Sequence, residues 1–337
     1  MKHFYWLGSS LLTLALTAGC QQEKYVLDVY STLRYDVLAL PTAADTLRLT
    51  TVDFVSAREG FVGGVRGTLF STADAGATWT RRTQPALGTI NKLLFTSATA
   101  GWAGTSAGLF RTSNGGQTWQ AVPTFNAYGS GLSEVTDVQF VSPQVGYVVG
   151  SLGGICKTTN GGNTWTAVQL RRDKVYTFRA VSFSSPDSDT VVGDEMAYWT
   201  TTNGGQTWDM LDYRGGAVTT TYDVLRTNQR VHQLARPDGF RARDASGSEF
   251  GPDESFGFPV YGLARWGGRG GPVVAVGERT IVRYHPAYSL NSSVPWVNVH
   301  QPDGTSFRAT YYAADFADAS TFYAVGARGT IHRFHYE

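Results

Sequence analysis

The chain has 337 residues, of which 42% are hydrophobic and 13% aromatic, and it contains 39 glycines. This composition excludes a disordered or fibrous chain and is typical of a globular domain rich in core residues and turns. The formal net charge of +1 gives no overall indication of nucleic-acid binding, so we expect no such partner and no cofactor.

The N-terminus has the pattern of an export signal. Lys2 and His3 precede an apolar stretch that runs from Phe4 to Leu16, followed by Thr17-Ala18-Gly19 and then Cys20. The stretch is shorter than the roughly 20 residues of a transmembrane helix. We predict a signal peptide over residues 1–19, a lipidated Cys20 with a tether over 20–24, and one folded domain over 25–337.

The small residues before Cys20 resemble the bacterial lipobox, although Thr17 stands where leucine is usual. Lipidation would hold the exported protein on a bacterial membrane, periplasmic or at the cell surface, and plain secretion is the alternative. With Cys20 acylated, Cys156 is the only other cysteine, so no intramolecular disulfide is possible. We expect a monomer that is stabilised by packing alone.

One motif, Thr-x-Asp/Asn-x-Gly-x-Thr-Trp, occurs four times, at residues 72–79, 112–119, 158–165 and 201–208. Successive motif tryptophans are 40, 46 and 43 residues apart, a period typical of solenoids and propellers. Three short apolar runs precede each motif, and a fourth strand would begin at the tryptophan. Each repeat therefore predicts one four-stranded antiparallel blade.

The motif residues predict a structural turn. The Asp or Asn can accept hydrogen bonds from backbone amides downstream, the glycine supplies a positive φ, and the tryptophan packs between blades. These residues are Asp74, Gly76 and Trp79, then Asn114, Gly116 and Trp119, then Asn160, Gly162 and Trp165, and finally Asn203, Gly205 and Trp208.

Beyond Trp208 the motif is absent but the strand rhythm continues. Residues 222–243, 260–284 and 311–334 predict a fifth, a sixth and a seventh blade, the last with only three strands. The N-terminal stretch from Tyr25 to Leu40 could supply its missing outer strand and so remove an open edge. We predict an all-β, seven-bladed β-propeller of four-stranded antiparallel blades closed by an N-terminal strand, with six or eight blades as alternatives.

The motif turns, preceded by strands such as Gly101-Trp102-Ala103-Gly104, resemble the Asp-box (bacterial neuraminidase repeat) propellers. They are more similar still to the photosystem II stability and assembly factor-like family. The resemblance covers about Thr51 to Trp208. It implies a seven-bladed propeller that acts as a binding scaffold for other proteins.

An enzyme is the alternative, because Asp-box propellers include glycosidases. A sialidase needs an arginine cluster, but its Phe-Arg-Ile-Pro signature is absent and the nearest string begins at Phe178-Arg179. Other glycosidases need two facing carboxylates, and the sequence does not pair the candidates, which are Asp194, Glu195, Asp223, Asp244 and Asp315. His332 and His335 are the closest histidine pair, and ordinary packing is favoured over a metal site. Cys156 aligns with Phe70 and Phe110, which predicts a buried thiol.

One group of arginines favours a binding function. Alignment of the repeats places Arg66, Arg279 and Arg328 at similar positions between the second and third strands of blades one, six and seven, which ring closure makes neighbours. The corresponding loop of blade four carries Asp194-Glu195. We hypothesise that the three arginines grip carboxylates or a peptide terminus through forked hydrogen bonds. The alternative is that they are ordinary solvated arginines.

These observations favour a non-catalytic, membrane-anchored scaffold that binds protein partners in the cell envelope. A carbohydrate-active propeller, either a glycoside hydrolase or a glycan-binding protein, is the runner-up. A purely structural surface lipoprotein is the third possibility.

Overall fold

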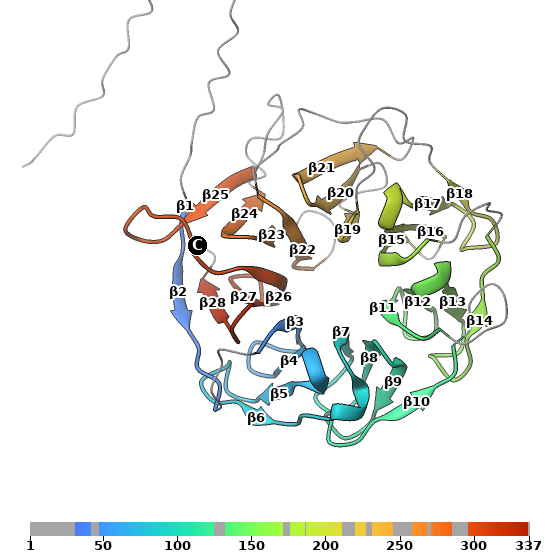
Figure 1. Ribbon diagram of the computed structural model, residues 1–337, viewed down its shortest axis with the longest axis horizontal. Coiled ribbons are helices and arrows are strands. Elements are labelled where there is room, and N and C mark those ends of the chain that lie inside the picture. Colours follow the sequence, from blue (N-terminus) through green and yellow to red (C-terminus); the bar gives the residue numbers. More distant parts are fainter. Residues whose placement is uncertain are drawn as a thin grey trace, which may run out of the picture.

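Seven β-sheets stand side by side in a ring in the computed structural model of the chain (Figure 1). The structure describes residues 31–41, 47–124, 132–170, 176–185, 187–210, 220–226, 231–244, 258–267, 271–284 and 296–335. The first strand of each sheet faces the axis and contacts the first strand of the next sheet around the whole ring. Within the described ranges, none of the helices combines the length and the apolar character that a membrane span requires.

The four sheets that contain the motif have four antiparallel strands each, in chain order from the axis outward. They are β3 (Leu49–Phe54), β4 (Gly60–Gly64), β5 (Leu69–Thr72) and β6 (Thr80–Arg81); β7 (Ile90–Phe95), β8 (Gly101–Thr105), β9 (Gly108–Thr112) and β10 (Gln120–Val122); β11 (Val135–Phe140), β12 (Gly146–Gly150), β13 (Ile155–Thr158) and β14 (Thr166–Ala167); and β15 (Phe178–Ser185), β16 (Ser188–Gly193), β17 (Tyr198–Thr201) and β18 (Asp209–Met210). Short 3₁₀ turns accompany them: η1 (Val65–Gly67), η2 (Pro85–Leu87), η3 (Ser151–Gly153) and η4 (Asp194–Met196).

The remaining three sheets differ from this pattern. The fifth consists of β19 (Asp223–Arg226), β20 (Val231–Arg236) and β21 (Gly239–Asp244). The sixth contains β22 (Val260–Arg265), β23 (Val273–Gly277), β24 (Thr280–Tyr284), β25 (Trp296–His300) and, as a fifth strand, β1 (Ser31–Thr32). The seventh contains β26 (Tyr311–Asp318), β27 (Thr321–Gly326), β28 (Ile331–His335) and, outermost, β2 (Arg34–Val37).

The prediction of a propeller built only from four-stranded antiparallel blades and closed by one N-terminal strand is therefore wrong. The fifth sheet has three strands within the described residues, where the sequence lacks the motif turn and tryptophan that hold a fourth. The N-terminal stretch divides between two sheets: β1 pairs with β25 in parallel, and β2 pairs with β28 in antiparallel. Leu33, 1% exposed, lies between them in the aliphatic and aromatic core of the last two blades, and this burial explains the crossing.

The motif turns have a common hydrogen-bond pattern. In the first, Thr78 donates its backbone N–H to Oδ1 of Asp74 (2.8 Å), and Gly76 donates to Oγ1 of Thr72 (2.8 Å). Gly76 has a φ of 81°, and a Cβ there would lie 2.6 Å from Leu38 Cδ1. Asn114, Asn160 and Asn203 accept the corresponding amides at 2.9, 3.0 and 2.9 Å. These local bonds reverse the chain and direct each tryptophan back toward the sheet.

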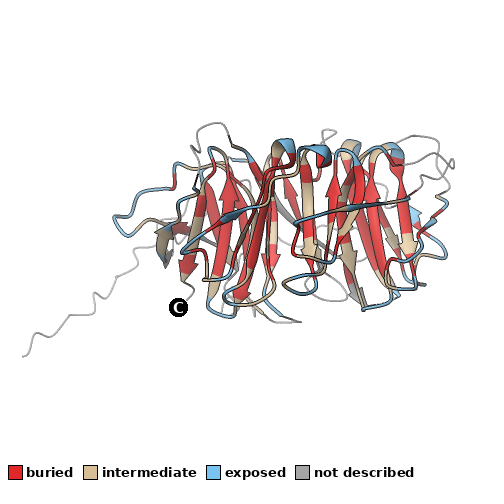
Figure 2. Cartoon of the chain, turned by 90° about the horizontal axis from the view of Figure 1, so that it is seen from below, coloured by how far each residue is buried: buried red, intermediate tan, exposed pale blue. Residues whose placement is uncertain are grey.

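The core is a set of aromatic contacts repeated between blades. A phenylalanine at or near the end of the first strand packs on a ring from the second strand of the preceding blade, and the motif tryptophan contacts one or both of these rings edge-on. The pairs across blades are Phe54 with Tyr323, Phe95 with Phe61, Phe140 with Trp102 and Phe183 with Tyr147. Figure 2 shows that burial runs through the strands, whereas exposed residues concentrate in the turns on both faces.

A charged contact fastens the N-terminal strand. Asp36 Oδ2 accepts hydrogen bonds from Arg333 Nε (2.9 Å) and Nη2 (2.5 Å) and lies 3.1 Å from His335 Nε2. Arg333 also donates through Nη1 to the carbonyl oxygen of Ala75 (3.1 Å), in the motif turn of the first blade. The hydrogen bond from Arg333 holds the pKa of Asp36 below its usual value of 3.8. The contact therefore joins β2, β28 and the first blade.

We expect Asp36→Ala to lower the free energy of unfolding at pH 7 by about 1 kcal/mol, because both partners are partly exposed. The folded pKa of Asp36 is lowered, so its contribution is present above pH 3.8 and is lost as the pH falls through the folded pKa. Urea unfolding at pH 7 and at pH 3 checks this. The difference between wild type and variant should shrink at pH 3, and an equal difference at both values would contradict the ion pair as its cause.

Candidate protein-binding face

The turns between the second and third strands share an unusual backbone conformation. Arg66, Leu152, Glu195, Arg279 and Arg328 have φ between 51° and 57°, in the left-handed region, and all five residues are exposed. A residue with a Cβ costs about 1–2 kcal/mol in this conformation. In each turn the residue with this conformation has its side chain in solvent. The turns lie on one face of the disc, which is the upper face in Figure 2.

Hydrogen bonds between blades fix the order of the three arginine turns. Arg279 donates its N–H to the carbonyl oxygen of Ala309 (3.1 Å), and Ala327 donates to Thr310 (3.0 Å). Val65 donates to the carbonyl oxygen of Arg48 (3.1 Å), and Arg48 forms an isolated bridge with Ala327. The structure therefore places Arg66, Arg279 and Arg328 on one face of three adjacent blades, where the sequence expected them. Their side chains make no hydrogen bond or ion pair with any described residue. Their binding role stays a prediction.

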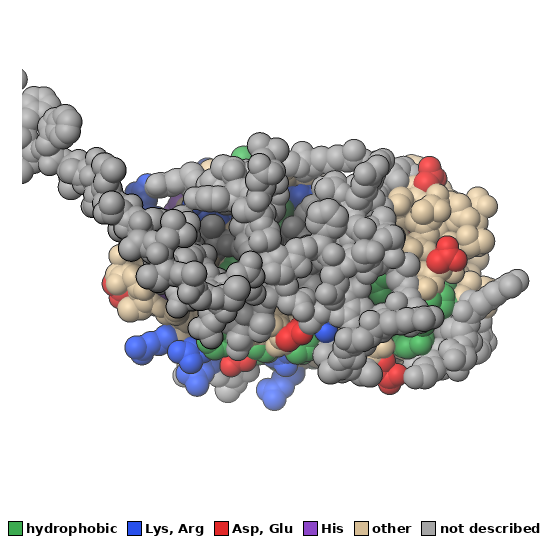
Figure 3. Space-filling model, turned by 90° about the horizontal axis from the view of Figure 1, so that it is seen from above, with side chains coloured by type: hydrophobic (Ala, Val, Ile, Leu, Met, Phe, Trp, Pro, Cys, Tyr) green, Lys and Arg blue, Asp and Glu red, His purple; other side chains and the backbone are tan. Residues whose placement is uncertain are grey.

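Two further arginines belong to this face and were missed from the sequence. Arg308 precedes Ala309 and Thr310, which lie between the turns of Arg279 and Arg328, and Arg48 lies between the turns of Arg328 and Arg66. Both residues are exposed. We call the five residues Arg48, Arg66, Arg279, Arg308 and Arg328 the arginine face. Lys and Arg side chains project together from the corresponding face, which is turned downward in Figure 3.

A row of tyrosines lies beside the arginine face. Tyr222, Tyr261 and Tyr312 hold equivalent positions at the start of the first strands of blades five, six and seven. Their ring centroids are 5.2 and 5.4 Å apart, and the guanidinium carbon of Arg48 lies 4.2 Å from the Tyr312 centroid. Burial raises the pKa of Tyr261, so this phenol is neutral at pH 7. The half-buried rings add apolar contact area next to the cations.

Blades three and four carry acidic residues on the same face. Arg179 donates to both carboxylate oxygens of Asp194, from Nε at 3.0 Å and Nη2 at 2.8 Å. Glu195 follows in the same turn, and Glu134 lies at the start of blade three. Arg179, the arginine of the sialidase-like string, is thus ion-paired, and so is the candidate carboxylate Asp194. The face is basic over blades six, seven and one and acidic over blades three and four.

The other candidate carboxylates join neighbouring blades. Asp315 Oδ2 accepts the backbone N–H of Phe54 (2.7 Å), and Asp223 Oδ2 accepts that of Leu263 (2.8 Å). Asp53 and Asp137 bond in the same way to Phe95 and Val181, at 2.6 and 3.0 Å. Each bond fastens the first strand of one blade to the first strand of the next. The side chain of Asp244, the fifth candidate, lies outside the described residues.

These four aspartates surround Lys92, and we call the five residues the inner-strand cluster. Lys92 Nζ lies 3.7 Å from Asp137 Oδ1, and the Asp137 charge raises the pKa of Lys92. Burial raises the pKa of Asp53 to about 8, with a further contribution from the charge of Asp315. Burial also raises the pKa values of Asp315 and Asp223 to about 6. The cluster therefore retains bound protons near neutral pH.

His332, His335 and Cys156 have structural contacts within the described residues. His332 Nδ1 lies 2.7 Å from the Tyr311 hydroxyl, and His335 contacts Asp36. Cys156 is buried in the core between blades two and three. No group of three or more metal-ligating side chains is found in the part of the chain that the structure describes. Cys20, the predicted lipidation site, lies outside that part.

The sequence matches the family model described as photosynthesis system II assembly factor YCF48, over residues 27–128 and 130–230. The chain belongs to the YCF48 family. No curated protein matches it. The match covers the first blades and the N-terminal segment, and the family assignment agrees with the resemblance that the motif turns carry.

Solved structures of YCF48 proteins have the same fold. The structure titled "YCF48 bound to D1 peptide" superposes with a TM-score of 0.69 at 18% identity, and covers 90% of this chain and 97% of its own. YCF48 from Cyanidioschyzon merolae gives 0.63 at 18% identity, with 89% and 98% covered. The WD40 repeats of RRP9 give 0.70 at 8% identity, with 90% and 97% covered. At these identities the similarity shows the fold alone.

Proposed function

We propose that the protein is a non-catalytic scaffold, anchored in the cell envelope through lipidated Cys20, that binds carboxylate groups of a protein partner on the arginine face. The observation that carries the proposal is the run of five exposed arginines over three adjacent blades. Arginine donates two parallel hydrogen bonds to a carboxylate, so several arginines on one face suit acidic side chains or a peptide terminus.

Two further observations support a protein partner. The chain belongs to a family of assembly factors, and one solved YCF48 protein is titled as bound to a peptide. The tyrosine row offers apolar contact next to the cations, as interface hot spots commonly do. The described chain begins with β1 on the sixth sheet, so a tether from Cys20 would reach the ring beside the arginine blades.

The test is a pull-down from detergent-solubilised envelope with wild type and with the triple variant Arg66→Ala, Arg279→Ala, Arg328→Ala. The three side chains make no bond with described residues, so we expect the variant to fold with an unchanged melting temperature. Loss of two or three charge-assisted contacts, each worth roughly 1.5–3 kcal/mol, should reduce the retained partner at least about tenfold.

A matched triple variant distinguishes an effect of the arginine face from an effect of the overall charge. Arg58→Ala, Arg81→Ala and Arg111→Ala remove the same charge outside the arginine face. This control should retain the partner as wild type does. An equal loss with both triple variants would show that net charge, rather than the face, holds the partner, and the proposed site would then be wrong.

A further inference from the structure

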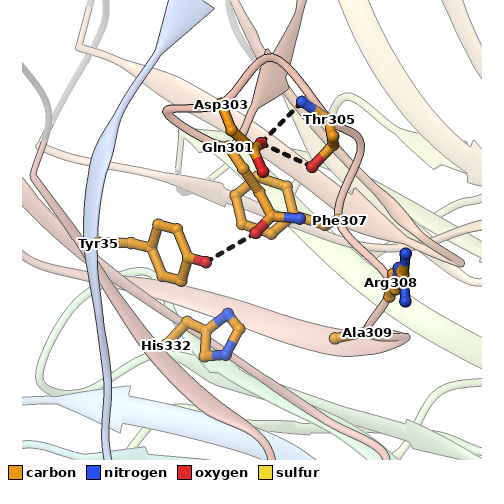
Figure 4. Close-up of a pocket in the computed structure, with 8 residues that line it drawn as sticks. All are labelled: Tyr35, Gln301, Asp303, Thr305, Phe307, Arg308, Ala309 and His332. Atoms are coloured by element: carbon orange, nitrogen blue, oxygen red, sulfur yellow. Dashed lines mark hydrogen bonds between the residues drawn. The ribbon is translucent and has the colours of Figure 1, made fainter.

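A cavity of about 440 Å³ opens at the seam where the N-terminal strand meets the last two blades. β2 and β28 form one side, and the segment between β25 and β26 forms the other (Figure 4). We call it the seam cavity. It is lined by Tyr35, Gln301, Asp303, Thr305, Phe307, Arg308, Ala309 and His332. Its volume lies in the usual range for ligand pockets, about 300–1,000 Å³.

Three rings form the inner wall of the seam cavity. The Tyr35 centroid lies 5.3 Å from that of Phe307 and 5.1 Å from that of His332. Phe307 is buried in the core, which fixes this wall. Burial lowers the pKa of His332 to about 4, so the imidazole is neutral at pH 7. The wall is therefore uncharged and aromatic, and it offers ring faces and edges to a further ring.

The rim is polar and largely occupied by its own hydrogen bonds. Tyr35 donates its hydroxyl to Gln301 Oε1 (2.9 Å), and Gln301 Nε2 donates to the carbonyl oxygen of Ser306 (3.0 Å). Asp303 Oδ1 accepts from both the N–H and the hydroxyl of Thr305, at 2.9 and 2.7 Å. Arg308 differs, because it makes no hydrogen bond or salt bridge within the described residues; only its charge reaches Asp303.

The mouth of the seam cavity lies next to the arginine face. Arg308 and Ala309 line the cavity and continue into Thr310. That segment is bonded on one side to the Arg279 turn and on the other side to the turn that carries Arg328. Arg308 therefore belongs both to the lining of the seam cavity and to the arginine face.

We propose that the seam cavity binds an aromatic side chain of the partner that stands next to a carboxylate held by Arg308. The proposal rests on the proposed function and adds a chemical class to it, namely a peptide whose aromatic residue is C-terminal or adjoins an acidic residue. The aromatic wall selects the ring, and the guanidinium of Arg308 selects the anion. Tyr35 belongs to β2, so the cavity is complete only when β2 is paired with β28.

Four small probes separate the two elements of recognition. They are N-acetyl-L-phenylalanine, its C-terminal amide, N-acetyl-L-alanine and N-acetyl-L-alaninamide, with dissociation constants measured by NMR titration of the whole folded domain. We expect N-acetyl-L-phenylalanine to bind most tightly, by about tenfold over both its amide and N-acetyl-L-alanine, which corresponds to about 1.4 kcal/mol for each element. Equal affinity for the phenylalanine and alanine compounds, or no binding by any of the four, overturns the proposal.

Two variants locate the binding. Ala309→Leu extends a side chain into the cavity and should lower the affinity for both phenylalanine compounds at least about fivefold, whereas Ala107→Leu, in an exposed turn of the second blade, should not. Arg308→Gln, a surface change that leaves the core intact, should weaken the acid toward the affinity of its amide and leave the amide unchanged. An unchanged preference in Arg308→Gln overturns the assigned role of Arg308, whether or not Ala309→Leu folds.

The outcomes also distinguish this proposal from the proposed function. One outcome would support the arginine face as the binding site and contradict the proposed role of the seam cavity. That outcome is a preference of the probes' binding for a carboxylate but not for phenylalanine, together with loss of the partner in the triple arginine variant. Conversely, a preference for phenylalanine that Ala309→Leu abolishes would support the proposed role of the seam cavity, even if the triple arginine variant still captured the partner.

Discussion

Trp165→Ala is expected to lower the free energy of unfolding by about 3–5 kcal/mol, the range measured when large buried aromatic residues are truncated. Trp165 is only 6% exposed, and its ring lies 5.9 Å from both Trp102 and Phe140 in edge-on contacts. Those two rings belong to neighbouring blades. Removal of the indole therefore leaves a cavity at a blade interface as well as within one blade.

The comparison of Trp165→Phe with Trp165→Ala tests whether lost packing causes the loss of stability. Trp165 Nε1 is buried without a hydrogen-bond partner among the described residues, so the indole contributes through packing alone. Phenylalanine keeps part of that packing and should recover part of the loss. Trp266→Ala is the matched control, because Trp266 is 37% exposed and its removal should lower the free energy of unfolding by clearly less than Trp165→Ala does. Urea unfolding gives all three values, and equal losses at the two tryptophans would contradict the packing argument.

The sequence predicted the motif turns because their bonds are local. Asp74, Thr72, Gly76 and Thr78 lie within seven residues, and side-chain bonds over such short separations depend little on the rest of the fold. The same locality explains why the four motif blades were assigned correctly strand by strand. The N-terminal stretch was assigned less well, because the two-residue β1 pairs with β25, more than 260 residues away, and no local pattern marks such a pairing.

The residues of the arginine face were also predicted only in part. Arg66, Arg279 and Arg328 occupy equivalent turns, so an alignment of the repeats found them. Arg48 and Arg308 lie in the segments that connect one blade to the next, which differ in length and have no common register. Hydrogen bonds between blades bring them to the same face, and only the structure shows these bonds. The seam cavity was missed for the same reason, because Tyr35 and His332 come together only when β2 pairs with β28.

The inner-strand cluster also depends on contacts between blades. Asp53 and Asp315 occupy the same position in their strands, whereas Asp137 and Asp223 stand two positions earlier, next to a bulge in the blade. Equivalent positions in the other blades hold residues such as Thr51 and Leu94, so the repeat gives no sign of a cluster. Because Asp223 and Asp315 bond to backbone amides of the next blade, their conformation is explained by the fold without a catalytic role.

The protein should lose stability as the pH rises from 5.5 to 8.5. The folded pKa of Asp53 is raised to about 8, and those of Asp315 and Asp223 to about 6, whereas each is near 3.8 in the unfolded chain. A raised folded pKa means that the folded state binds more protons than the unfolded state over this range. Its contribution is therefore fully present below pH 3.8 and is lost as the pH passes through 6 to 8. Urea unfolding at pH 5.5, 7 and 8.5 measures the slope.

Asp53→Asn should reduce that slope and raise the free energy of unfolding at pH 8.5 by on the order of 1–2 kcal/mol, since one unit of pKa shift corresponds to about 1.4 kcal/mol. An asparagine oxygen can still accept the amide of Phe95, so the bond between the blades is kept while the charge next to Asp315 is removed. We expect an increase in the free energy of unfolding at the lower end of this range, because the Lys92 side chain is 44% exposed and water therefore reaches the cluster. Asp209→Asn, in the exposed outer strand β18, controls for the change in net charge. If both variants gave the same slope as wild type, the protons bound near neutral pH would have to lie outside the inner-strand cluster.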